Sequence, residues 1–181
     1  MELKTISTLQ LEDIRAECIA AICLRAALRV RPLMPSLKVE DCAILGNAIA
    51  CARFVLLEEE DTSRLMTLSE NVYQIAATNA VRFRNDPSMV NERCSIAGVI
   101  IHSAIDCVAD FETDERAARA NAMLTLRSCG KLSVSSIECA VIADLQQDGT
   151  NKSTPRSGVL DQFGPLWPND PPDWFVKGLD V

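Results

Sequence analysis

The stretch NDPSMVNERCSIAGVIIHSAIDCVADF, residues 85–111, decides the fold of this chain. Asp86 is the expected helix N-cap and Pro87 the first helical residue, where the missing backbone donor of proline costs nothing. The middle of the segment is apolar on nearly every face, which is typical of a helix surrounded by other helices. We therefore predict a central helix here and place the rest of the fold around it.

Five further helices are expected on either side of this segment. The helical periodicity of apolar positions predicts them over about 8–30, 38–57, 65–84, 113–129 and 135–149. Pro32 and Pro35 end the first helix, because the ring removes a backbone donor, and Gly130 is expected to end the fifth in the left-handed conformation. Strands are not expected, since no stretch shows sustained period-two alternation.

The connections between these helices are short, which favours antiparallel neighbours packed in sequence. We expect an all-α fold, a compact bundle of about six antiparallel helices over residues 1–148. A linker and an extended, proline-rich tail over residues 149–181 would follow, docked on the same domain. The length of 181 residues suits one core rather than two.

The second helix, with the sequence CAILGNAIACA at residues 42–52, presents small residues on several faces. Gly46 and Ala50 lie four positions apart and therefore share one face. Glycine lowers helix propensity by about 1 kcal/mol relative to alanine. Together these two residues would let a neighbouring backbone approach closely.

The ending GPLWPNDPPDWFVKGLDV, residues 164–181, differs from everything before it. Both tryptophans and four of the eight prolines lie between Gly164 and Trp174. The prolines favour extended backbone and exclude a helix through most of the segment. Two uses stay open: the tail lies across the bundle and covers grooves between small residues, or it presents its aromatic side chains to a partner. The internal use is favoured, since exposed Trp and Phe in one patch promote association.

The formal net charge is −7, and clustered Lys and Arg for neutralising phosphates are missing. We therefore expect no nucleic-acid partner. An acidic surface fits a basic protein partner, and it fits plain solubility equally. The longest uncharged run, 94–105, has 12 residues, well under the ~20 of a membrane span. We expect a cytoplasmic protein with no membrane partner, and a homo-oligomer stays open.

Eight cysteines raise the question of disulfides or a metal. Cys18 and Cys23 are five positions apart, and Cys42 and Cys51 nine, so neither pair shares a helix face. All except Cys129 lie well inside an apolar helical pattern, where free cysteine behaves as a small hydrophobe. Reduced core thiols are the expectation, with an inter-helix disulfide or a redox role as the alternatives.

His102 is the only histidine and lies in the central helix. A catalytic interpretation pairs it with Asp106, one turn later on the same face, and takes Cys94 or Cys107 as nucleophile. Both cysteines point elsewhere, Cys94 about 80° and Cys107 about 140° around the helix. Motifs for phosphate, dinucleotide, zinc-protease or hydrolase chemistry do not occur. We predict no catalytic residue, no cofactor and no metal site; a pocket near His102 and Asp106 is the alternative.

Candidate partner-binding residues come from the two ends of the chain. Arg25 and Arg29 lie one turn apart on one face of the first helix. They would meet an acidic partner or phosphate, or pair with nearby carboxylates. Trp167, Trp174 and Phe175 are the corresponding aromatic anchors of the tail.

The segments IRAECIAAICLRAALRVRPLM, residues 14–34, and PLWPNDPPDWF, residues 165–175, resemble a group of uncharacterised alanine-rich helical bacterial modules. In that group a helical bundle is followed by a tryptophan–proline motif of the L-W-P…P-x-W kind. The matching residues are 25–33 and 166–174. The resemblance implies an adaptor or regulatory role and assigns no catalytic or binding residue.

Two functional hypotheses follow. The preferred one is a non-enzymatic protein-interaction or regulatory module, such as the adaptor or neutralising subunit of a bacterial two-component system. The alternative is a small-molecule sensor or enzyme with a pocket inside the bundle near His102.

Overall fold

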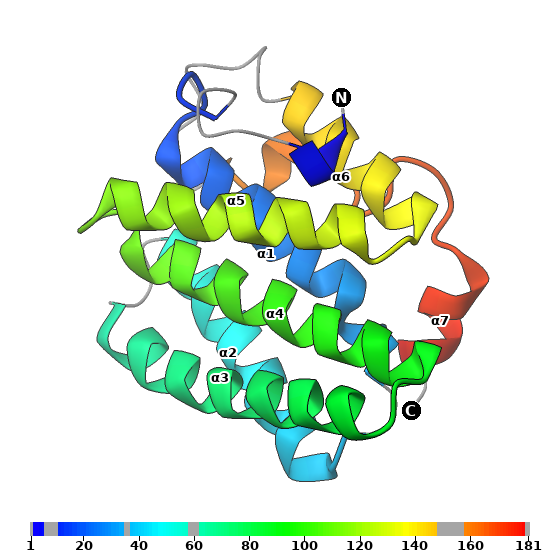
Figure 1. The fold of residues 1–181 in the computed structure, drawn as a ribbon. Helices are drawn as coiled ribbons and strands as arrows, with labels where there is room; N and C mark the ends of the chain where they lie inside the picture. Colours follow the sequence, from blue (N-terminus) through cyan, green and yellow to red (C-terminus); the bar gives the residue numbers. More distant parts are fainter. Residues whose placement is uncertain (1, 6–10, 35–36, 58–61, 148–157, 180–181) are drawn as a thin grey trace.

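The computed structural model describes residues 2–5, 11–34, 37–57, 62–147 and 158–179. Within these ranges the chain is all-α, with six substantial helices and a short seventh packed in a bundle (Figure 1). The helices are α1 (Ala16–Val30), α2 (Val39–Leu56), α3 (Thr62–Asn85), α4 (Met89–Asp110), α5 (Glu115–Lys131), α6 (Ser135–Gln147) and α7 (Asp173–Leu179).

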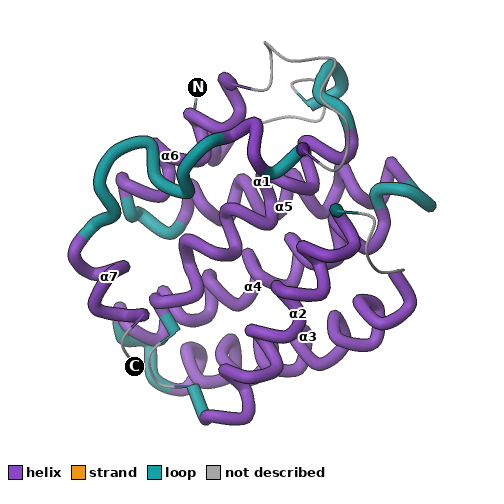
Figure 2. Tube along the Cα trace, turned by 180° about the vertical axis from the view of Figure 1, so that it is seen from behind, coloured by secondary structure: helices purple, strands orange, loops and turns teal. Residues whose placement is uncertain are grey.

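The central position of α4 is confirmed. It packs against α1, α3 and α5, and its residues Ile100, Ile101 and Ile105 are fully buried. Figure 1 shows α3, α4 and α5 side by side in one layer, with α1 and α2 in the layer behind, which Figure 2 shows from the other side. The α3–α4 contact is close at Gly98, where a Cβ would lie 3.1 Å from the Cα of Ala76.

The first helix begins at Ala16, so the prediction that it starts at Thr8 was wrong; residues 6–10 lie outside the described part of the chain. The carbonyl of Leu11 accepts from the backbone N–H of Ile14 at 3.1 Å, so residues 11–14 form a turn before α1. The guanidinium of Arg119 in α5 donates to the carbonyls of Leu11 and Ile14, at 3.1 Å for Ile14, and holds this turn against α5.

The N-cap of α4 is Ser88 and not Asp86. The Ser88 side chain accepts from the backbone N–H of Asn91 at 3.3 Å, and the helix begins at Met89. Asp86 is occupied otherwise, since its carboxylate accepts from the side-chain amide of Asn91 at 2.9 Å. Pro87 therefore lies before the cap and not at the first helical position.

Gly130 does not end α5 in the left-handed conformation. It lies inside the helix, which continues to Lys131, and the residue with positive φ is Ser133 at 56°. Glycine is needed at 130 for a different reason: a Cβ there would lie 2.7 Å from the backbone nitrogen of Lys4. The missing side chain lets the short N-terminal 3-10 turn pack directly on α5.

The tail is docked on the bundle. Val159, Phe163, Trp167 and Phe175 are buried in the same hydrophobic core as the helices. The proline-rich part is non-helical as predicted, and the short α7 begins at 173, directly after the last proline. Proline fixes a φ that suits the start of a helix, so the prolines that prevent helix before 173 permit it afterwards.

Six of the eight cysteines are buried, Cys42 is half-buried and Cys139 is exposed. The expectation of a core thiol is wrong for Cys139, which faces solvent from α6, while Cys129, outside the apolar pattern in the sequence, is fully buried on α5. In the described residues, none of the helices is both long enough and apolar enough to span a bilayer.

Candidate functional site

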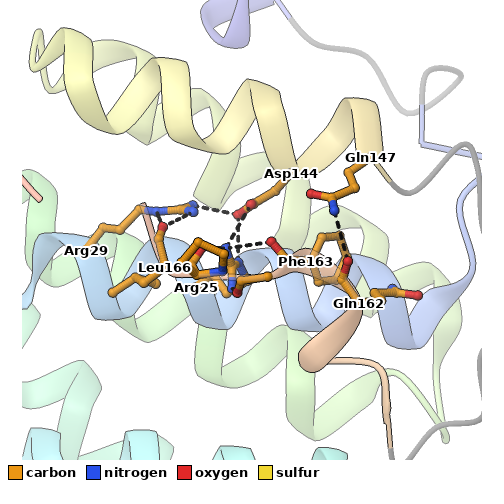
Figure 3. A network of polar contacts seen from close by, with 9 residues as sticks. Arg25, Arg29, Asp144, Gln147, Gln162, Phe163 and Leu166 are labelled. Carbon is orange, nitrogen blue, oxygen red and sulfur yellow. Dashed lines mark hydrogen bonds and ion pairs between the residues drawn. The ribbon is translucent and has the colours of Figure 1, made fainter. Parts of the chain in front are cut away.

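Arg25 and Arg29 of α1 meet Asp144 of α6 inside the protein (Figure 3). Asp144 Oδ2 lies 3.0 Å from Arg25 Nε and 2.6 Å from Arg29 Nη1, and Asp144 Oδ1 lies 3.1 Å from Arg25 Nη2. Arg29 is 0% exposed and Asp144 3%. We call these three residues the arginine clasp.

The clasp holds the tail by its backbone. Arg25 donates to the carbonyls of Gly164, at 3.1 Å, and Pro165, at 2.6 Å. Arg29 donates through Nε to the carbonyl of Leu166 at 2.9 Å (Figure 3). Because these hydrogen bonds go to carbonyl groups, the two arginines fix the path of the tail backbone.

The rings of the tail complete the contact with the arginines. The Arg25 guanidinium lies 5.5 Å from the ring centroid of Phe163, and that of Arg29 lies 5.7 Å from the centroid of Trp167. Both distances are in the range of cation–π attraction. The sequence showed that Arg25 and Arg29 share a face, but the structure directs this face toward the chain's own tail.

The clasp is electrostatically unbalanced. It holds two cations and one carboxylate, while the tail adds only neutral carbonyl groups at this point. Burial lowers the pKa of Arg29, and the hydrogen bond and charge of Asp144 act in the opposite direction. Arginine stays protonated in proteins, so the clasp offers no general acid or base near neutral pH. The role that its contacts support is to hold the tail in place on α1 and α6.

Trp167, Trp174 and Phe175 form an edge-to-face cluster. The ring centroids of Trp167 lie 5.9 Å from Trp174 and 5.1 Å from Phe175. Trp167 and Phe175 are buried, while Trp174 is half-buried. The cluster therefore packs inward, and its role as an anchor for a partner stays a prediction.

The docked tail forms one wall of an apolar groove of about 800 Å³, whose other walls are α1 and α2. The apolar lining consists of Leu24 and Leu28 of α1, Gly46, Ile49, Ala50 and Phe54 of α2, Leu57, and Leu160 and Leu166 of the tail. The charged residues in the described lining are Arg25 and Arg53. We call this the α1–α2–tail groove.

The α1–α2–tail groove contains the pair Gly46 and Ala50 that the sequence marked for close approach of a backbone. Ala50, Arg53 and Phe54 are exposed, Phe54 at 45%, so the groove is open to solvent. The sequence favoured a tail that lies across the bundle beside small residues, and the structure places Leu160 and Leu166 of the tail opposite Gly46 and Ala50.

His102 lies in a second groove, of about 370 Å³, between α3 and α4. Its Nε2 is 3.3 Å from Asp106 Oδ2, and the hydroxyl of Ser69 donates to Asp106 Oδ1. The ring of Tyr73 lies 5.3 Å from that of His102. The predicted pairing with Asp106 is present, but the groove is on the surface: Tyr73 is 49% exposed and His102 is half-buried.

The groove at His102 lacks a nucleophile placed against the imidazole. The Ser69 hydroxyl is bonded to Asp106 and not to His102, while Cys94 and Cys107 are buried and do not line this groove. Asp110 also lines it, and partial burial together with the charge of Asp106 raises its pKa. The site collects negative charge and does not form a catalytic triad.

Three thiols lie deeper in the core. A hydrogen bond with Cys107 and burial both raise the pKa of Cys23, and burial raises the pKa of Cys129. The thiols of Cys23 and Cys129, held protonated in this way, are poor nucleophiles and poor metal ligands. The described residues contain no group of three or more His, Cys, Asp or Glu side chains arranged to hold a metal ion.

No family model, curated protein or solved structure matches this chain. The resemblance to alanine-rich bacterial modules therefore stays a prediction. The α1–α2–tail groove is the larger of the two, with about 800 Å³ against about 370 Å³.

Proposed function

We propose that the protein is a non-enzymatic interaction module that holds an element of a partner protein in the α1–α2–tail groove. The observation that supports this is the groove itself: about 800 Å³, predominantly apolar, and open at Ala50 and Phe54. Apolar grooves between helices are a recurring way of binding peptides, in which an amphipathic helix buries its apolar face. An adaptor or neutralising subunit needs a surface of this kind.

The openness of the groove favours a protein over a small molecule. Small-molecule sites bury most of the ligand surface, about 70–90%, whereas Ala50, Arg53 and Phe54 leave one side of this groove in solvent. The lining holds arginine as its charged residue type and no histidine, cysteine or carboxylate in the described residues. Groups for acid, base or nucleophilic chemistry are therefore lacking, and binding is the activity that the lining supports.

Site-specific photo-crosslinking tests the proposal. A benzoylphenylalanine at position 54, expressed in the cells from which the chain comes, should give an adduct of one defined mass. The same group at Val81, which is 52% exposed on α3, is the matched control and should not give it. Ala50→Gln, which places a longer polar side chain in the middle of the groove, should abolish the adduct and leave the circular dichroism spectrum unchanged. Equal adducts at positions 54 and 81, or an adduct that survives Ala50→Gln, would refute this function.

A second candidate function rests on the groove at His102. Glu70, Asp106 and Asp110 converge there beside the Tyr73 ring, and neither lysine nor arginine is present in the described lining. Carboxylates next to an aromatic face suit an organic cation or the basic side chain of a partner. This candidate is the small-molecule sensor that the sequence left as the alternative.

The only histidine of the chain makes the second candidate easy to test by nuclear magnetic resonance. Guanidinium and spermidine, titrated to millimolar concentration, should shift the His102 ring resonances in a saturable way. Asp106→Asn should weaken the effect, and Asp170→Asn, at an exposed site far along the chain, should not. Shifts that do not saturate, or that are the same in Asp106→Asn, would exclude a cation site.

A further inference from the structure

The outward face of α2 carries an apolar stripe that continues the α1–α2–tail groove. The stripe comprises Val39, Ala43, Gly46, Ala50, Phe54 and Leu57. Their spacings of four, three, four, four and three residues place them on one side of the helix. Val39 is 85% exposed and Phe54 45%. The opposite side, with Leu45, Ala52 and Val55, is buried in the core.

A helix with apolar residues on two opposite faces, as in α2, is typically surrounded by protein. The helices that pack most extensively against α2 are α1, α3 and α4, and the tail lies beside the groove. They leave Val39, Ala43, Ala50 and Phe54 exposed, while Gly46 and Leu57 are half-buried. A second helix could approach the α2 backbone closely at the small residue Ala50 and pack between the larger side chains on either side.

Charge beside the middle of the stripe is positive. Arg53 lines the groove, and Arg31 Nη2 lies 3.5 Å from where a Cβ of Gly46 would be. Arg25 lines the inner wall but is paired with Asp144, and Glu40 and Asp41 lie at the Val39 end of the stripe. The net charge of −7 for the whole chain favours a basic partner, but surface charges beyond about 8–10 Å are largely screened by salt. At the middle of the stripe, Arg31 and Arg53 therefore set the local charge.

Resting on the proposed function, we propose that the partner element is an amphipathic helix with acidic residues flanking its apolar face, lying along the α2 stripe. The stripe runs from Val39 to Leu57, which corresponds to roughly 27 Å and about five helical turns. Leu28 and the tail residues Leu160 and Leu166 form the wall beside it. Glutamate or aspartate on the flanks of such a helix would meet the arginines in charge-assisted hydrogen bonds.

Two synthetic peptides test the charge and the helix together. Both carry the same five-turn leucine–alanine stripe; one is flanked by glutamate and the other by lysine. By fluorescence anisotropy, the full-length protein should bind the glutamate peptide at least ten-fold more tightly, and the difference should shrink with added salt. Arg31→Glu combined with Arg53→Glu should reverse the preference. Arg84→Glu combined with Arg116→Glu changes the net charge equally at exposed sites away from the groove and should leave it as it was.

The possible outcomes separate this inference from the proposed function. If the lysine-flanked peptide binds more tightly, or if the double variant at Arg31 and Arg53 keeps the wild-type preference for the glutamate-flanked peptide, the inference of an acidic partner is wrong. The photo-crosslink at position 54 can still succeed in that case. If both peptides bind weakly and the photo-crosslink joins position 54 to a non-helical segment of a partner, the inference that the partner element is a helix is wrong. Sedimentation that shows a dimer of this chain, lost in Ala50→Gln, makes a second copy the occupant and overturns the inference. Loss of the crosslink itself overturns the proposed function.

Discussion

At the scale of single residues, Asp144 carries the greatest electrostatic weight. One carboxylate serves Arg25 and Arg29, and both guanidinium groups are buried with it. Removing one partner of a buried ion pair leaves an uncompensated charge, which costs about 3–5 kcal/mol. Asp144→Asn should lower the free energy of unfolding by about that amount in urea titrations. Asp170→Asn, at an exposed position, is the control and should change the free energy of unfolding by no more than about 0.5 kcal/mol. If Asp144→Asn changed the free energy of unfolding by as little as this control, the clasp would not hold the tail.

Asp110 gives a prediction of opposite sign. Partial burial and the charge of Asp106 raise its pKa, and it is the last residue of α4, where the helix dipole disfavours negative charge. A raised pKa means that this carboxyl stabilises the fold when protonated and that the contribution is lost as pH rises through the folded pKa. Asp110→Asn should therefore raise the melting temperature at pH 7, and the gain should vanish near pH 3, where the wild-type group is protonated in both states. A gain of equal size at both pH values would contradict the electrostatic origin.

At this scale the sequence predicted contacts within one helix but not contacts between helices that are far apart in the chain. The one-turn spacing of Arg25 and Arg29 predicted a shared face, and the same spacing predicted that His102 meets Asp106. Asp144 was not identified as the partner of the arginines, because it follows Arg29 by 115 positions and no local rule links them. The cap of α4 shifted from Asp86 to Ser88 for a similar reason: both are good caps, and the side chain of Asn91 decides between them.

At the scale of elements, the tail is the part whose stability depends on a few large side chains. Trp167 is 7% exposed and contacts Trp174, Phe175 and the Arg29 guanidinium. Trp167→Ala should cost about 3–5 kcal/mol of unfolding free energy, as for other buried tryptophans. Trp174→Ala should cost less, because that ring is half-buried. Equal costs for the two, measured by urea unfolding followed by circular dichroism, would contradict the inward orientation of the cluster.

The helices themselves were predictable because their apolar periodicity is long and their breakers are proline. Helix ends were less so. Glycine is the residue type that most often ends a helix, which is why Gly130 was predicted to end α5. Its role is instead set by the close packing of Lys4 against it. A contact between two segments so far apart in the chain cannot be predicted from the local sequence. The helix α7 was not predicted, because its seven residues are too few to show a helical periodicity of apolar positions.

At the scale of the whole molecule, the clasp and the groove meet at Leu166, and Arg25 of the clasp also lines the groove. The Leu166 carbonyl accepts from Arg29, and the same residue lines the groove. Two binding events that use one element are thermodynamically linked, so a ligand of the groove should also stabilise the docked tail. With the glutamate-flanked peptide bound, hydrogen exchange at the backbone amides of Phe163, Gly164, Leu166 and Trp167 should slow. The same peptide should have no such effect on Ala50→Gln, and unchanged exchange in the wild type with peptide bound would show that tail and groove act independently.

The arginine clasp also has a consequence for biosynthesis. Leu166, the last acceptor of the two arginines, follows Arg29 by 137 positions, so at about 5–20 residues per second the two arginines are synthesised roughly 7–27 s before all of their acceptors exist. A chain that ends before Asp144 lacks the carboxylate and the tail carbonyls to which Arg25 and Arg29 are bonded. Its two guanidinium groups have none of the acceptors that bury them in the folded protein.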